Sequence, residues 1–249
     1  MSNENKLEEW GKIFTVYPAS VDNLYWLLYL QVREEMEKFY EGFGMESDVI
    51  APPVDELAKY YGIKVEKRSL SSSRDLFKNG ISGFLDSYAM DGEQPQTFIF
   101  VNDKISYFSA RYVIAHEIAH FVMMVRGDQS REPQFCKSTL FSKNYKEKIC
   151  DIMASFILLP IEEVIKLMYD FCYDKNGVRK ETLDSDEWYE HLRYVFKISY
   201  NRTLLCYEDI RGLASVMYAL IKNGENIDTI FHDKEVKDNW LNKYSLLFK

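Results

Sequence analysis

The sequence has few cysteines, prolines and glycines, no long apolar run and no excess of basic residues. Its 249 residues include 6 prolines and 11 glycines, too few for a collagen-like or low-complexity chain. No segment approaches the ~18–20 apolar residues that span a bilayer, so we expect no membrane-spanning helix. The polar N-terminus has no apolar signal core, and none of the cysteines forms a Cys-x-x-Cys pair. We therefore predict a cytoplasmic protein with reduced thiols, most of them small buried residues. The cysteines are Cys136, Cys150, Cys172 and Cys206.

The charge balance argues against nucleic acid and membrane surfaces as partners. The net charge is −8, whereas a nucleic-acid binder needs a positive face to displace counterions from phosphates. Residues 192–210 resemble a helix-turn-helix that would place Arg202 on its second helix. Acidic residues soon follow, so we predict a structural helical pair and no direct binding of nucleic acid. Hydrophobic residues make up 47% and aromatic residues 15% of the chain, enough for a packed core.

Apolar periodicity divides the chain into a mixed fold. An apolar stripe predicts a helix over 21–41, and Pro53 starts a short helix over 54–61. Alternation predicts about three strands, at 63–66, 81–85 and 97–101, with a hairpin-like connection over 86–96. Further helices are predicted over 107–125, 144–158, 161–172, 186–196, 200–208 and 211–222, with a long polar connection over 126–143. The predicted class is α+β, a small β-sheet packed against helices. We divide it into an N-terminal helical extension (1–50), a central domain that includes a C-terminal helical pair (51–212) and a helical tail (213–249).

One pentapeptide carries the strongest chemical signal, because residues 116–120 read His-Glu-Ile-Ala-His. On a helix, positions i and i+4 share a face, so His116 and His120 can place two imidazole nitrogens on one zinc ion. Glu117 is turned by about 100° around the helix, which favours a role as base for a water molecule rather than as ligand. The alternative is two histidines at helical spacing by chance. The apolar flanks, however, predict a buried helix, in which unpartnered polar groups would cost several kcal/mol.

A catalytic zinc site needs a third protein ligand. The candidates are Glu147, Asp151, His191 and His232. Glu147 and Asp151 lie one turn apart on the helix predicted over 144–158. This spacing suits a carboxylate ligand followed by an aspartate that accepts a hydrogen bond from a ligand histidine. The other interpretation of both is a solvated helix charge. The two histidines lie in charged surroundings, which is typical of surface positions.

Several segments, in order, resemble the ImmA/IrrE-type metallopeptidases. Residues 53–65 are similar to that family's opening helix and strand, and 109–120 to its Arg-Phe-x-x-Ala-His-Glu-x-x-His helix. Residues 147–160 are similar to its Glu-x-x-Ala-Asn-x-Phe-Ala-x-x-Leu-Leu-Met-Pro segment. The resemblance runs from about residue 52 to 210. Cys150 stands where Ala is usual and Ala119 where Gly is frequent, but no departure removes a ligand or the base.

The resemblance implies that His116, His120 and Glu147 hold Zn²⁺ and that Glu117 is the catalytic base, while the spacing on the helix gives Asp151 the role of supporting a ligand histidine. It also implies a zinc-dependent endopeptidase that cleaves a helix-turn-helix transcriptional repressor and so relieves repression, in a prophage, a mobile element or a stress regulon. The competing interpretation is a non-proteolytic zinc-containing module that binds and sequesters a repressor. Three tyrosines near the site residues in sequence are candidates for stabilising the oxyanion: Tyr107, Tyr112 and Tyr145.

Overall fold

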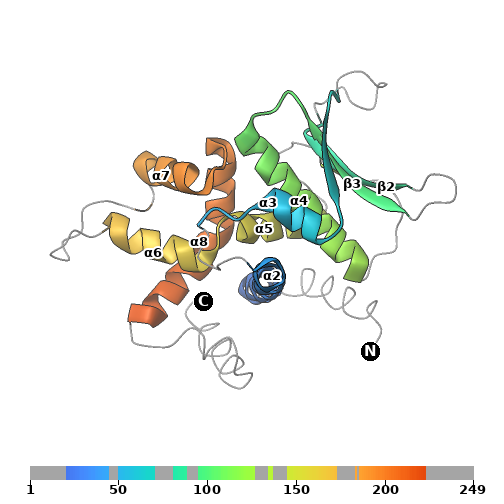
Figure 1. Ribbon diagram of the computed structural model, residues 1–249. Helices are drawn as coiled ribbons and strands as arrows, with labels where there is room; N and C mark the ends of the chain where they lie inside the picture. Colours follow the sequence, from blue (N-terminus) through green and yellow to red (C-terminus); the bar gives the residue numbers. More distant parts are fainter. Residues whose placement is uncertain are drawn as a thin grey trace.

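The computed structural model describes residues 21–44, 50–70, 81–88, 95–126, 134–136, 145–172, 183 and 185–222. Its elements follow the chain as α2 (Val21–Phe43), α3 (Val54–Tyr60), β1 (Lys64–Arg68), β2 (Gly83–Tyr88), β3 (Gln96–Asn102), α4 (Tyr107–Arg126), β4 (Gln134–Cys136), α5 (Tyr145–Leu158), α6 (Ile161–Cys172), α7 (Asp186–Phe196) and α8 (Tyr200–Lys222). The predicted α+β class, a small sheet packed against helices, is confirmed. Figure 1 shows α4 between the sheet on one side and helices α5–α8 on the other.

The sheet has four strands in the order β1-β3-β2-β4. Strand β1 runs parallel to β3, and β2 pairs antiparallel with both β3 and β4. Strands β2 and β3 pair antiparallel, with Leu85 opposite Ile99, but both extend into the connection predicted over 86–96, because residues 86–88 and 96 belong to the strands. The prediction of about three strands was one short, because β4 lies within the region predicted as a polar connection. It is only three residues long, and its pairing with β2 leaves no local signal in the sequence.

Close packing between the sheet and α4 depends on Gly83. A Cβ atom there would lie 2.4 Å from Val113 Cγ1 on α4 and 2.6 Å from the Phe100 carbonyl oxygen. Only glycine fits such an approach without displacing its neighbours. On the same face of the sheet, Leu85 and Ile99 are 3% and 0% exposed and join the main core. The sheet therefore forms one wall around the middle of α4.

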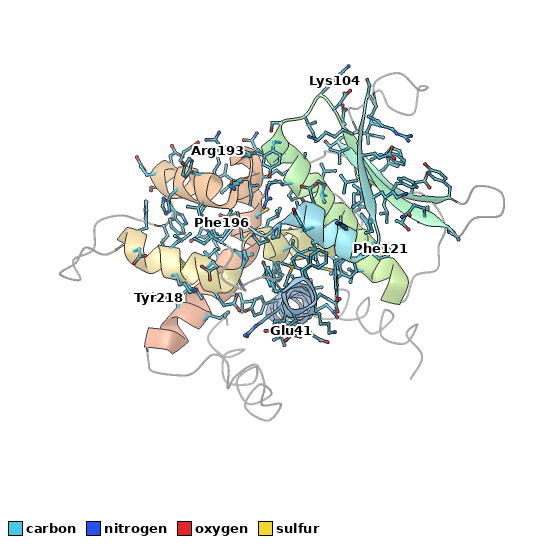
Figure 2. The ribbon with its side chains drawn as sticks, viewed as in Figure 1. Glu41, Lys104, Phe121, Arg193, Phe196 and Tyr218 are labelled. Atoms are coloured by element: carbon cyan, nitrogen blue, oxygen red, sulfur yellow. The ribbon has the colours of Figure 1, made fainter. Side chains whose placement is uncertain are left out.

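Helix α4 is apolar on nearly every side, because it lies between two layers. Ala115 and Ala119 are fully buried, and Ile118 is 1% exposed. Their small and branched side chains let the neighbouring layers approach the helix closely. At the N-terminal end of α4, Lys104 in Figure 2 lies at the connection from the sheet. The polar residues near the middle of α4 are consequently enclosed by protein.

The first described helix, α2, shares the core of the central domain. Its Leu28, Val32 and Phe39 belong to that core, and Tyr29 packs edge-on against Phe156 of α5, with ring centroids 5.6 Å apart. The Tyr29 hydroxyl also donates a hydrogen bond to the Glu162 carboxylate of α6. The helix predicted over 21–41 thus packs directly on α5 and α6.

The last two described helices differ in one respect from the prediction. Ser185 caps α7 by accepting a hydrogen bond from the Trp188 amide, and Phe196 near its end is fully buried (Figure 2). The two helices predicted over 200–208 and 211–222 are one continuous helix, α8. Gly212 suggested a break, but it lies in open space on the exposed side. The buried stripe runs past it to Ala214, and this packing outweighs the weak helix preference of one glycine.

Among the described residues, none of the helices has the length and apolar character required to cross a membrane.

Candidate metal centre

Helix α4 positions the two histidines and the glutamate of the His-Glu-x-x-His motif. His116 and His120 lie one turn apart and are 1% and 4% exposed, and Glu117 between them is fully buried. The layers on both sides of α4 keep water away from these groups. Any charge on them therefore needs a partner within the protein, or burial costs several kcal/mol.

Helix α5 brings a carboxylate to the two imidazoles. Glu147 lies in the first turn of α5, with Oε2 3.3 Å from His116 Nε2 and Oε1 3.4 Å from His120 Nε2. The two Nε2 atoms are 3.0 Å apart. One possible ligand atom from each residue lies within 4.8 Å of the others. The three predicted ligands are thus brought together, and their role in binding a metal remains a prediction.

The arrangement of ring nitrogens fits a bound cation. His116 Nδ1 lies 3.0 Å from Asp151 Oδ1, and His120 Nδ1 lies 3.4 Å from Cys150 Sγ. When each Nδ1 carries the ring proton, both Nε2 lone pairs face each other and the Glu147 carboxylate. Such a group is repulsive unless a cation or a shared proton lies at its centre. Two neutral imidazoles and one carboxylate are a donor set of catalytic zinc sites, which keep a fourth position open.

The ionisation of these groups favours metal binding. Burial alone would raise the pKa of Glu147, but the neighbouring imidazoles of His116 and His120 lower this pKa to about 2. Burial lowers the pKa of His120, which favours the neutral imidazole. Burial also opposes ionisation of Asp151, yet the hydrogen bond from His116 keeps its pKa below the ordinary value. Ionised carboxylates and a neutral imidazole are the forms that bind a metal ion.

Glu117 differs from the other two carboxylates. Burial raises its pKa to about 8, although the nearby His116 opposes the shift. The Leu85 amide of β2 is close enough to lower this pKa. Nevertheless, neither carboxylate oxygen accepts a hydrogen bond of ordinary geometry from the described part of the chain. A buried carboxylate with both oxygens unpaired is uncommon in a native protein, and it leaves Glu117 able to accept a proton.

A further layer of side chains holds Asp151 in place. Tyr112 of α4 donates a 2.5 Å hydrogen bond to Asp151 Oδ1, the oxygen that also faces His116. Arg202 of α8 lies over the Tyr112 ring, with Cζ 4.0 Å from the ring centroid. Tyr112 is only 3% exposed. Because Asp151 engages its hydroxyl, Tyr112 supports the site rather than offering a free group for an oxyanion.

The other candidates from the sequence do not join this group. His191 of α7 stacks on the Trp188 ring, with centroids 6.1 Å apart, and is not part of the ligand cluster. Tyr107 is the first residue of α4 and is 52% exposed. His232 and the side chain of Tyr145 lie outside the described residues.

The segment that resembles a helix-turn-helix forms the end of α7, a turn and the start of α8. Lys197 ends α7 in the left-handed conformation, with φ of 55°. Asp209 of α8 is 2.6 Å from Lys148 Nζ and 3.0 Å from Ser155 Oγ, which ties α8 to α5. These contacts agree with a helical pair packed on the domain. The absence of nucleic-acid binding remains a prediction.

Sequence reasoning did not identify Cys150 as a neighbour of the site. This residue of α5 is fully buried, and burial raises the pKa of its thiol. Its Sγ lies 3.4 Å from His120 Nδ1 and 3.5 Å from Met123 Sδ. The sequence offered one signal, the presence of cysteine where the similar family has alanine. Cys150 and Cys206 are both free, as predicted, whereas the side chains of Cys136 and Cys172 lie outside the described residues.

Comparison with known protein families finds a match that spans the site. The family model described as the IrrE N-terminal-like domain, a peptidase family, matches residues 58–201, more than half of the chain. The match covers α4 and α5, which carry the cluster of His116, His120 and Glu147. No curated protein gives a significant match to the chain. The family supports a metallopeptidase type of function for this site.

Proposed function

Because the chain belongs to the IrrE N-terminal-like family of peptidases, we propose that it is a zinc-dependent endopeptidase acting on a protein substrate in the cytoplasm. One observation carries the proposal. His116, His120 and Glu147 converge within 4.8 Å. Glu117, which follows His116 on α4, is a buried carboxylate whose oxygens accept no hydrogen bond of ordinary geometry from the described residues. Convergent ligands beside an unpaired carboxylate are the parts that metal-assisted hydrolysis requires.

His116 and His120 would hold the metal through their Nε2 atoms, and Glu147 through a carboxylate oxygen. Bound zinc supplies Lewis acidity, which polarises a carbonyl and lowers the pKa of a water molecule toward ~7. Three protein ligands suit this chemistry better than four, because a closed shell would leave no position for a reactant. Glu147 also contributes the negative charge that balances a cation in this otherwise apolar interior.

Glu117 would act as the base. Its carboxylate takes the proton from the attacking water and passes it to the amine that leaves. A base works best when its pKa is near the working pH, and burial raises the pKa of Glu117 to about 8. Among the described residues, no donor makes a hydrogen bond of ordinary geometry to its oxygens, so Glu117 is free to accept the proton.

We further propose that the substrate is a helix-turn-helix repressor, as the resemblance to ImmA/IrrE-type enzymes implies. Peptide backbone must be extended for its carbonyl to reach the site, so an exposed linker is a better target than a packed helix. The net charge of −8 would also attract a basic DNA-binding protein and increase the rate of encounter at low salt.

The experiment is incubation of the zinc-loaded protein with the product of a neighbouring repressor gene, followed by mass spectrometry. We expect cleavage of one internal peptide bond outside the DNA-reading helices, which gives two fragments. A chelator should stop cleavage, and added zinc should restore it. His116→Ala serves as the matched control without metal. An intact repressor under all zinc-loaded conditions would contradict this substrate, and a cut within a DNA-reading helix would contradict the requirement for extended backbone.

A further inference from the structure

We propose that Cys150 is a positioning residue for His120: its sulfur accepts the hydrogen bond from His120 Nδ1 and so keeps the Nε2 lone pair directed at the metal position. The proposal rests on the proposed function only in taking His120 Nε2 as a ligand. It assigns to this cysteine a role that the usual alanine of similar sequences cannot perform.

The direction of the hydrogen bond follows from what surrounds the thiol. Cys150 Sγ is 3.5 Å from Met123 Sδ, and a thioether has no proton to give, so the S–H group points to Met123. The sulfur lone pairs are then left for His120 Nδ1, at 3.4 Å. His120 therefore carries its proton on Nδ1, and Nε2 is the unprotonated atom that faces Glu147 and His116.

The facing surfaces of two helices build this contact. Glu147, Cys150 and Asp151 occupy positions i, i+3 and i+4 of α5, which lie on one face. His116 and His120 lie on the opposed face of α4, and Met123 continues that face by one further turn. The same contact between α4 and α5 thus supplies a ligand and a separate support for each histidine.

The two supports differ in strength. Asp151 offers His116 an ionised oxygen at 3.0 Å, whereas Cys150 offers His120 a neutral sulfur at 3.4 Å. Hydrogen bonds to charged acceptors are roughly twice as strong as those between neutral groups, and sulfur is a weaker acceptor than oxygen. We therefore infer that His120 is the more weakly oriented of the two histidines.

The first test reads which nitrogen of His120 carries its proton in the metal-free protein by ¹⁵N nuclear magnetic resonance. We expect this proton on Nδ1 of His120 in the wild type, with the proton shared at the centre of the cluster on Nε2 of His116, and a mixture of His120 tautomers in Cys150→Ala and Met123→Leu. Cys150→Ser keeps a group that can accept the bond and should restore Nδ1–H. A wild-type His120 with its proton on Nε2 would overturn the proposal.

The second test is zinc affinity measured by competition with a chelator. Loss of an outer hydrogen-bond partner typically weakens metal binding ~10–100-fold, and for a sulfur acceptor we expect the low end, about tenfold, in Cys150→Ala. Cys206→Ala is the matched control, because Cys206 is equally buried and free but lies on α8. Equal affinities and unchanged tautomers in both variants would refute the positioning role. If zinc bound nowhere, the proposed function would fail, while the tautomer of the metal-free protein would still decide the role of Cys150.

Discussion

Removing Glu147 or Asp151, one turn apart on α5, should weaken zinc binding to different extents. Glu147 faces both Nε2 atoms, at 3.3 and 3.4 Å, so Glu147→Ala deletes one of three ligands. Of the two histidines, Asp151 contacts only His116, with Oδ1 3.0 Å from Nδ1, and it acts on the metal through that ring. Asp151→Ala should cost about 10–100-fold in affinity, which equals roughly 1.4–2.7 kcal/mol. Glu147→Ala should cost more than that.

The hydrogen bonds of Asp151 give a second value for the cost of Asp151→Ala. Asp151→Ala leaves two buried donors without their acceptor, the N–H of His116 and the hydroxyl of Tyr112. One unsatisfied buried donor costs about 1–3 kcal/mol, and part of that cost appears as misorientation of the His116 ring. Asp151→Asn retains an oxygen acceptor but loses the charge, so its effect should be smaller than that of Asp151→Ala.

The assay is a zinc titration against a chelator of known affinity, with circular dichroism to confirm that each variant is folded. Glu190→Ala is the charge control, because Glu190 is an exposed residue of α7 bonded to Arg193. We expect affinity to fall in the order wild type and Glu190→Ala, then Asp151→Asn, Asp151→Ala and finally Glu147→Ala. A larger loss in Asp151→Ala than in Glu147→Ala would exchange the two roles and refute the assignment of Glu147 as ligand.

Three further predictions concern the metal, the packing and the pH dependence. His116→Ala and His120→Ala should each lose bound zinc at neutral pH, and metal analysis showing full zinc in both would eliminate the site. Gly83→Ala should lower the free energy of unfolding in urea by about 1–3 kcal/mol, because its Cβ would lie 2.4 Å from Val113 Cγ1. Gly212→Ala, in open space on α8, should raise it by about 0.5–1 kcal/mol, and a similar loss in both would contradict the close packing on α4. Burial raises the pKa of Cys206 to about 12, so the folded state favours the protonated thiol. That contribution is complete below the pKa of the unfolded thiol, and stability should decline from about pH 9 toward 12. In urea titrations, the free energy of unfolding of Cys206→Ala should decline less steeply over this pH range. An identical decline in this variant would contradict a contribution from the Cys206 thiol.

The sequence predicted the parts of the fold that have strong local signals. The apolar stripe of α2 and the apolar flanks of α4 predicted long helices with nearly the observed bounds. The strand β4 has three residues and pairs with β2 across a large separation in sequence, so no local pattern indicated it. In α8 a local signal was misleading. Gly212 predicted a break between two helices, but packing of the buried stripe keeps α8 continuous.

The same division applies to the site. The spacing of His116, Glu117 and His120 follows from helical geometry alone. Glu147 was one of four candidates for the third ligand, and the resemblance selected it. The contacts of Cys150 with His120 and of Tyr112 with Asp151 depend on how α4 and α5 are rotated and shifted against each other. This relative placement of the two helices is set by packing in the core, so the spacing of residues within one helix cannot predict it.

If the metal site uses Glu117 as its base, the variant Glu117→Gln should retain zinc and lose hydrolysis. Gln has nearly the same shape but cannot take a proton, and general-base catalysis is typically worth ~10²–10⁴-fold in rate. Zinc content and repressor hydrolysis should be measured on the same preparation. We expect one zinc ion per chain, as in the wild type, and hydrolysis reduced at least a hundredfold. Wild-type hydrolysis by this zinc-loaded variant would contradict this role of Glu117.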